Sequence, residues 1–119
     1  MAKPFVHLEL ATPDLHKAKD FYSKLFNWTI TDSDSGNGWV YSMFKPDEGP
    51  GGGMFTMPGI PPSWLAYVGV DDIKDAPANA TDLGATVIRG PQEVPGHGWM
   101  TVIKDPTGAP IALWQGTTS

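Results

Sequence analysis

Hydrophobic and polar residues alternate along residues 5–10, as they do in a strand that buries one face. One face carries two polar side chains and the other is aliphatic: Phe5, His7 and Glu9 against Val6, Leu8 and Leu10. We therefore expect residues 5–10 to form a strand whose aliphatic face lies against the core.

The spacing of apolar residues changes to three and four after Thr12-Pro13-Asp14, which predicts an amphipathic helix of about three turns. Thr12 can cap this helix, Pro13 suits its first position, and Asp14 suits the positive end of the helix dipole. The helix should close near Phe26-Asn27. Its apolar positions are Leu15, Ala18, Phe21, Tyr22 and Leu25.

The second half of the chain repeats the order of elements found in the first half. Strands are expected at residues 28–31, 39–44, 53–57, 64–70, 85–89, 99–103 and 110–115, and residues 32–38 read as a turn. A shift of 58 positions lays Asp14-Leu15 on Asp72-Ile73, which indicates a duplicated βαβββ module. Pro77 predicts that the second helix begins late, near Asp75, or is kinked.

This pattern predicts a single domain of 119 residues. Module one covers about 4–57, residues 58–63 form a proline-rich linker, and module two covers about 64–115. The fold class is α+β, with paired βαβββ modules and helices outside a sheet.

Composition narrows the function classes. A formal charge of −5 without a basic cluster disfavours nucleic acid as a partner. The absence of cysteine excludes disulfides and thiolate metal sites. The first residues lack the apolar segment of a secretion signal, and no apolar run reaches membrane-spanning length. We therefore expect a cytoplasmic protein without a membrane partner.

Two motifs resemble those of the vicinal-oxygen-chelate superfamily, which includes glyoxalase I, bleomycin-resistance proteins and extradiol dioxygenases. They are ATPDLHKAKDFYSKLFNW in module one and DPTGAPIALWQ at the end of module two. Within the superfamily the chain looks most like glyoxalase-like single-domain proteins. The resemblance implies that the two modules form a curved mixed sheet, an open barrel, with a ligand cleft between them.

The resemblance also implies four positions for the ligands of a divalent metal, one on the first and one on the last strand of each module. In this sequence these positions carry His7, Met54, Leu65 and Ala112. Leucine and alanine offer no donor, and a thioether suits hard or borderline divalent metals poorly. We therefore expect no cofactor and no metal site of the usual kind, with a site of unusual ligands left as an alternative.

The same resemblance, with the alternation of the strands, predicts which residues touch a ligand. The expected cleft floor consists of His7, Glu9, Met54, Leu65, Tyr67 and Ala112. Trp39 or Tyr41 and a loop with His97 and Trp99 are expected to form the walls. His7 and Glu9 are also the candidate catalytic residues, because imidazole and carboxylate can serve as acid and base.

The glycine run Gly51-Gly52-Gly53 is not followed by Gly-Lys-Ser/Thr, which argues against a phosphate-binding loop. It favours a close approach of neighbouring strands instead.

These observations predict a protein that binds a small organic molecule in a largely aromatic pocket and assembles as a homodimer. One alternative is a lyase or isomerase of the glyoxalase type, like lactoylglutathione lyase. It would use a non-standard metal site or acid–base catalysis by His7 and Glu9. The other is a non-catalytic structural or regulatory module.

Overall fold

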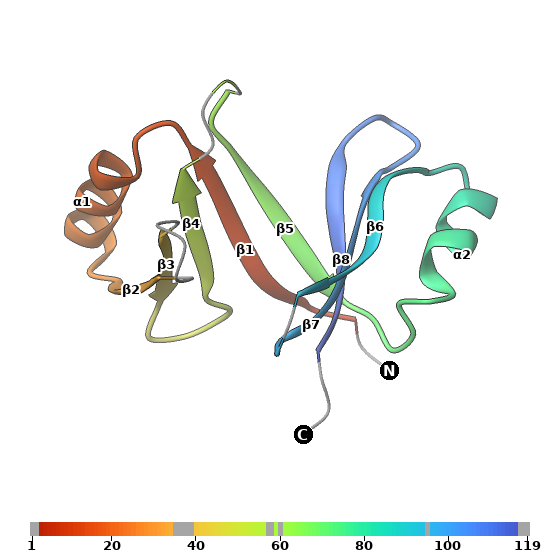
Figure 1. Ribbon diagram of the computed structural model, residues 1–119, viewed down its shortest axis with the longest axis horizontal. Helices are drawn as coiled ribbons and strands as arrows, with labels where there is room; N and C mark the ends of the chain where they lie inside the picture. Colours follow the sequence, from red (N-terminus) through yellow and green to blue (C-terminus); the bar gives the residue numbers. More distant parts are fainter. Residues whose placement is uncertain (1–2, 35–39, 57–58, 60, 95, 117–119) are drawn as a thin grey trace. The chain divides into compact units, whose positions relative to one another are not determined.

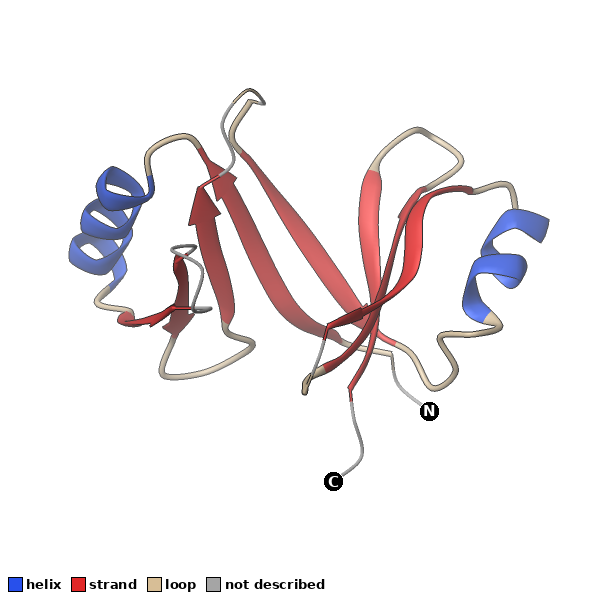
Figure 2. Cartoon of the chain, in the orientation of Figure 1, coloured by secondary structure: helices blue, strands red, loops and turns tan. Residues whose placement is uncertain are grey.

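The computed structural model describes residues 3–34, 40–56, 59, 61–94 and 96–116 of the chain. Contacts divide this part of the chain into two compact units. One unit consists of residues 7–64 and contains most of module one. The other consists of residues 65–116 together with residues 3–6 and contains nearly all of module two. The elements of both modules follow the order strand, helix and three strands (Figure 2).

Module one contains a four-stranded mixed sheet with the strand order β2-β3-β4-β1. Its elements are β1 (Phe5–Thr12), α1 (Leu15–Phe26), β2 (Thr29–Asp34), β3 (Val40–Lys45) and β4 (Gly52–Thr56). β1 and β4 are parallel, whereas the pairs β2–β3 and β3–β4 are antiparallel. Helix α1 lies beside this sheet (Figure 1), and the core between them is built on Leu10, Phe44 and Met54.

Helix α1 begins one residue after Asp14, whose carboxylate accepts a hydrogen bond of 3.0 Å from the backbone N–H of Lys17. Asp14 is therefore the N-cap, which corrects the prediction that Thr12 fills this role. The Thr12 hydroxyl instead accepts a hydrogen bond from the Asp14 N–H at 3.2 Å. The helix ends at Asn27, which adopts the left-handed conformation common at helix C-termini.

Only part of the predicted apolar stripe of α1 faces the core. Leu15, Ala18 and Tyr22 pack against the buried residues of the sheet, whereas Phe21 and Leu25 are more than half exposed. The predicted stripe is thus wider than the contact that the helix makes with this sheet.

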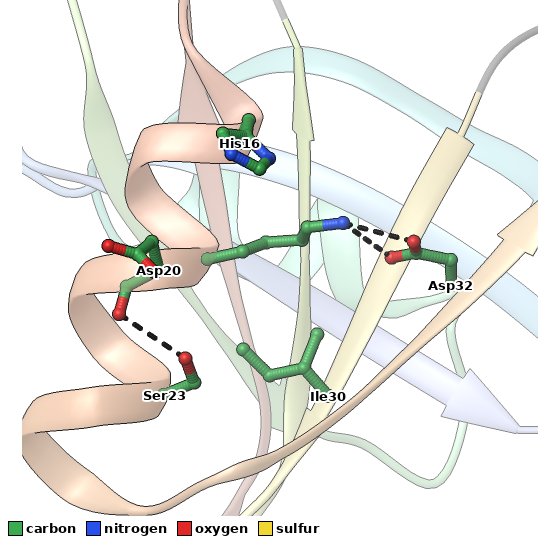
Figure 3. A pocket seen from close by; sticks show the side chains of 6 residues that line it. His16, Asp20, Ser23, Ile30 and Asp32 are labelled. Carbon is green, nitrogen blue, oxygen red and sulfur yellow. Dashed lines mark hydrogen bonds and ion pairs between the residues drawn. The ribbon is translucent and has the colours of Figure 1, made fainter.

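A polar contact fastens α1 to the sheet at one side of this core (Figure 3). The Asp32 carboxylate accepts hydrogen bonds from Lys19 Nζ at 3.0 and 3.1 Å and from the buried Ser42 hydroxyl at 2.6 Å. The hydrogen bond from Ser42, followed by that from Lys19, holds the pKa of Asp32 below its ordinary value of 3.8. The ionised form of Asp32 therefore stabilises the folded protein.

We expect Asp32→Asn to lower the free energy of unfolding at neutral pH by up to about 1 kcal/mol, because Asp32 is half exposed. The folded-state pKa is depressed, so this stabilisation is fully present above the unfolded-state pKa. It is lost as the pH falls through the lower folded-state pKa. Urea unfolding of both proteins between about pH 7 and pH 2 measures the difference. A difference that stays constant down to the acid end of this range would contradict the assignment.

Module two repeats the arrangement, with the strand order β5-β8-β7-β6. Its elements are β5 (Ser63–Gly69), α2 (Ala76–Asp82), β6 (Thr86–Val94), β7 (Gly98–Lys104) and β8 (Pro110–Gly116). β5 and β8 are parallel, and the other neighbours are antiparallel. The N-terminal residues 3–6 join this module: Pro4 O accepts a hydrogen bond of 3.0 Å from the Gly69 N–H.

The second helix begins late, as the sequence predicts. Asp75 is its N-cap and Pro77 lies in its first turn, where the missing N–H of proline is not needed. The predicted fold class, α+β with paired βαβββ modules and a mixed sheet, is confirmed, and neither four-stranded sheet closes on itself. Neither α1 nor α2, the helices of the described residues, has the length and apolar character needed to span a bilayer.

Candidate functional site

Strand β1 presents two polar side chains on the face of the module-one sheet that lies away from α1. Leu8 and Leu10 belong to the core under the helix, and successive side chains of a strand point to opposite faces. His7 and Glu9 therefore lie on the other face, as the alternation in the sequence predicts. Their side chains keep 29% and 20% of their surface exposed, so both reach solvent.

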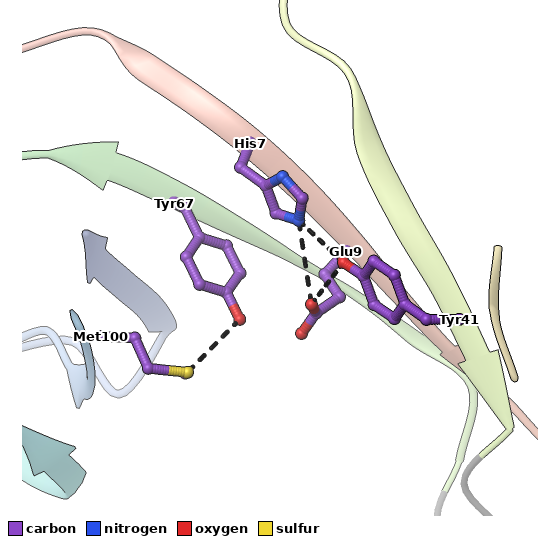
Figure 4. Close-up of polar contacts among 5 residues, drawn as sticks. All are labelled: His7, Glu9, Tyr41, Tyr67 and Met100. Carbon is purple, nitrogen blue, oxygen red and sulfur yellow. Dashed lines mark hydrogen bonds and ion pairs between the residues drawn. The ribbon is translucent and has the colours of Figure 1, made fainter. Parts of the chain in front are cut away.

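Tyr41, on β3, connects the two residues through its hydroxyl group (Figure 4). Its Oη lies 2.9 Å from Nε2 of His7 and donates to Oε2 of Glu9 at 2.8 Å. A phenol carries one proton, which here goes to the carboxylate, and so Nε2 of His7 is the donor to Oη. We call His7, Tyr41 and Glu9 the polar triad.

The polar triad forms a directed chain of hydrogen bonds from imidazole through phenol to carboxylate. Nε2 of His7 is also only 3.8 Å from Oε2 of Glu9, so a protonated imidazole would form an ion pair with the carboxylate. These groups can orient a ligand that carries hydroxyl or carbonyl oxygens. They are also the side chains that serve in general acid–base catalysis.

Met54 lies on the opposite face from the polar triad, which corrects the prediction that it belongs with His7 and Glu9. In the parallel ladder between β1 and β4, Glu9 pairs with Gly53 and Leu10 with Met54. Met54 is completely buried in the core under α1. The position beside Glu9 belongs to Gly53. The prediction was wrong by one residue because the glycine run contains no hydrophobic alternation from which the register could be predicted.

The equivalent face of module two is apolar. Tyr67 pairs with Ala112 in the parallel ladder of β5 and β8, just as Glu9 pairs with Gly53 in module one. Both residues are buried in one cluster against which Leu65 packs, so the structure brings these three predicted residues together. The Tyr67 hydroxyl points to the sulfur of a methionine on β7, with 4.0 Å between Oη and Sδ of Met100 (Figure 4).

The residues predicted to form the walls separate from one another. Trp99 pairs with Gln115 inside the regular ladder of β7 and β8, and it alternates with Met100. Trp99 therefore lies on the face opposite Tyr67, which corrects its prediction as a wall. Its place in a strand agrees with the strand predicted at residues 99–103. His97 is exposed in the turn before β7, and Trp39 lies outside the described residues.

The four positions that the resemblance assigns to metal ligands can now be read from the strand pairing. They carry His7, Gly53, Leu65 and Ala112, because Gly53 replaces Met54 as the counterpart of Ala112. One imidazole, a glycine and two aliphatic side chains do not supply the His and carboxylate donors that such a site requires. Within the described ranges, no group of three or more His, Cys, Asp or Glu side chains could hold a metal ion.

Comparison with known families connects this arrangement to a named group of proteins. The sequence model of the "Glyoxalase/Bleomycin resistance protein/Dioxygenase superfamily" matches residues 5–113, nearly the whole chain. The chain belongs to this superfamily. The resemblance stated from the two motifs is thereby confirmed.

Two relatives are longer proteins that match this chain over part of their length. CFP32 of Mycobacterium tuberculosis, whose name assigns it provisionally to the glyoxylases, is 35% identical over 114 residues, covering 91% of this chain and 44% of the relative. The "Anthracycline biosynthesis protein DnrV" of Streptomyces peucetius is 34% identical over 127 residues, covering 90% of this chain and 45% of the relative. The chain thus spans less than half the length of both relatives.

Solved structures with low sequence identity share the fold. Methylmalonyl-CoA epimerase from Mycobacterium tuberculosis has a TM-score of 0.72 at 14% identity, covering 96% of this chain and 88% of that chain. Protein BH1468 from Bacillus halodurans C-125 has a TM-score of 0.76 at 12% identity, covering 100% and 98%. These likenesses concern the fold of the superfamily alone.

Sequence reasoning missed the central position of Tyr41 and the part played by Gly53. Tyr41 was expected as a wall residue, yet its hydroxyl lies between the imidazole and the carboxylate of the polar triad. A signal was present: Tyr41 alternates with the buried residues Ser42 and Phe44, so its side chain had to point away from α1. Its contact with β1 depends on strand register, which the pattern does not contain.

Proposed function

We propose that the chain binds a small organic molecule through the polar triad of module one. The observation that carries this proposal is that His7, Tyr41 and Glu9 converge from two strands while the side chains of His7 and Glu9 remain partly exposed. A polar network with a purely structural role would gain from complete burial, because its hydrogen bonds are stronger away from water. Here a ligand oxygen or nitrogen can reach the network from solvent.

The chemistry of the triad indicates the ligand class. Glu9 accepts hydrogen bonds, and Tyr41 and His7 can donate or accept once a ligand replaces a hydrogen bond within the triad, which suits a molecule with hydroxyl and carbonyl oxygens. The names of the Streptomyces relatives point to anthracyclines, aromatic compounds that carry both groups. We expect apolar contact to supply most of the affinity and the polar triad to orient the ligand.

A lyase or isomerase of the glyoxalase type is the second candidate. It is supported by the two hydrogen bonds that link the His7 imidazole to the Glu9 carboxylate through the Tyr41 hydroxyl. Such a chain can take a proton from a carbon acid at one end and deliver it elsewhere without a metal ion. A third reading, a structural or regulatory module, predicts no ligand at the triad.

The homodimer expected from the sequence stays a proposal. The molecular mass from analytical ultracentrifugation would decide between monomer and dimer.

Titration of the protein with an anthracycline, followed by tryptophan fluorescence, tests the leading proposal. We expect saturable binding at micromolar concentrations, no consumption of the anthracycline, and well under one equivalent of zinc, nickel, manganese or iron after purification without added metal. The metal content follows from the missing donors at Gly53, Leu65 and Ala112.

The other outcomes favour the alternatives. Conversion of the hemithioacetal of methylglyoxal and glutathione by metal-poor protein would support the acid–base enzyme. The same conversion with one tightly bound metal per chain would overturn the metal-free reading. Absence of both binding and turnover would leave the structural module as the better account.

A further inference from the structure

Gly53 occupies the position on β4 directly beside Glu9, and its backbone does not require glycine. Glycines in the left-handed region, such as Gly49 and Gly108, are strained when replaced, but Gly53 does not have such a conformation. Its residue type must therefore be explained by what a side chain would meet.

A Cβ atom at Gly53 would overlap the Cζ, Oη and Cε2 atoms of Tyr41. The end of the phenol ring thus lies against the bare backbone of Gly53. The neighbouring Gly52 differs, because a Cβ there would overlap the backbone carbonyl of Leu8. The sequence predicted a close approach of backbones for the whole glycine run, and this explains Gly52. The absence of a side chain at Gly53 instead leaves room for the phenol ring of Tyr41.

The strand order shows why this room matters. β4 lies between β3 and β1, so Tyr41 and Glu9 belong to strands about 10 Å apart, twice the usual spacing. A side chain from β3 reaches β1 only by lying across β4. Gly53 is the residue of β4 over which the phenol crosses to contact both His7 and Glu9.

Module two contains the same crossing with different chemistry. Met100 pairs with Trp114 as Tyr41 pairs with Phe55, and its sulfur reaches across β8 to Tyr67. The residue under this crossing is Ala112 rather than glycine. A flexible thioether passes over a methyl group, whereas a Cβ at position 53 would overlap the rigid ring of Tyr41.

We propose that Gly53 is a positioning residue that determines what module one binds. By admitting the Tyr41 phenol across β4, it places a hydroxyl group where the resemblance puts a metal-ligating side chain on the last strand. It also commits Nε2 of His7 to donating a hydrogen bond. Module one then takes an organic molecule with hydroxyl or carbonyl oxygens instead of a divalent cation. The effect on the ligand rests on the proposed function, but the effect on Tyr41 does not.

The experiment compares Gly53→Ala in two backgrounds, the wild-type chain and Tyr41→Ala, by urea unfolding. In the wild-type chain the new methyl group displaces Tyr41, so we expect a lower unfolding midpoint. In the Tyr41→Ala background the clash is gone, and alanine should leave the midpoint unchanged or raise it. Gly116→Ala is the matched control, because its Cβ would lie 3.4 Å from Nε1 of Trp114, a distance of ordinary van der Waals contact. Should Tyr41→Ala not fold, Tyr41→Leu takes its place.

Imidazole NMR of His7 supplies a readout that simple destabilisation would not move. In spectra of the neutral imidazole, wild-type His7 should show the Nε2–H tautomer. Gly53→Ala should give a mixture of tautomers, and Gly116→Ala should match the wild type. Equal midpoint losses in both backgrounds, or an unchanged His7 tautomer in Gly53→Ala, would overturn the inference.

Anthracycline affinity separates this inference from the proposed function. A dissociation constant raised about five-fold or more in Gly53→Ala, together with the changes above, supports both. If the stability coupling and the tautomer change occur but the wild type binds no anthracycline, the ligand proposal fails while the positioning of Tyr41 by Gly53 stands. If the wild type binds and the coupling is absent, this inference alone fails.

Discussion

Met54→Ala should lower the free energy of unfolding by about 2–5 kcal/mol, as is usual for truncation of a buried methionine. Met54 is completely buried and packs with Leu10 and Phe44 in the core under α1. The variant removes apolar contacts and leaves a cavity that a sheet covered by a helix closes only in part. Equilibrium unfolding in urea measures the loss.

Met43→Ala is the matched control for stability, because Met43 lies on the same sheet but is half exposed. It should change the free energy of unfolding by no more than about 0.5 kcal/mol. Met54→Ala also tests the corrected position of Met54. Ligand affinity of the folded Met54→Ala protein should equal that of the wild type, and a clear loss of affinity without loss of stability would return Met54 to the binding site.

The order of elements could be predicted from the sequence because it depends on local signals. The apolar spacing after Pro13 identified the first helix, and Pro77 placed the start of the second helix near Asp75, where the structure has it. The N-cap of α1 was missed by two residues. Thr12 and Asp14 are both good capping residues, and only the path of the chain decides which carboxylate or hydroxyl faces the open N–H groups.

The candidate site could be predicted only as far as alternation within one strand reaches. His7 and Glu9 share a face because they are two residues apart, and the same holds for Leu65 and Tyr67. Residues from different strands depend on register, which the hydrophobic pattern fixes poorly in the run before Met54. The pairing predicted there differs by one residue from the observed pairing, and a difference of one residue exchanges the two faces of a sheet.

The error at Trp99 has a different cause. The sequence around Gly96 and Gly98 is typical of a loop, so Trp99, at the start of the strand predicted at residues 99–103, was expected to form a wall together with His97. The structure continues the strand ladder back to Gly98, and this regular pairing turns Trp99 away from Met100. Glycine favours a turn locally, but the pairing with β8 decides where the strand begins.

His7→Ala should make the free energy of ligand binding to module one less favourable by about 1–3 kcal/mol, a loss of roughly 5- to 150-fold in affinity. The substitution removes the imidazole that donates to the Tyr41 hydroxyl at 2.9 Å. With this donor gone, the phenol loses one of the contacts that fix its position and proton direction toward Glu9. The ligand then meets a less ordered set of polar partners.

Isothermal titration calorimetry with an anthracycline measures this loss, and His16→Ala serves as the matched control. His16 is exposed on α1, near Lys19 and Asp32 and on the helix side of the module-one sheet (Figure 3). Its removal should change neither affinity nor binding enthalpy. Glu9→Gln adds a second measurement, because the amide keeps the size of the side chain but replaces the carboxylate that accepts the hydrogen bond from Tyr41. If His7→Ala and His16→Ala bind equally well, the ligand does not use the polar triad, because only His7 belongs to it.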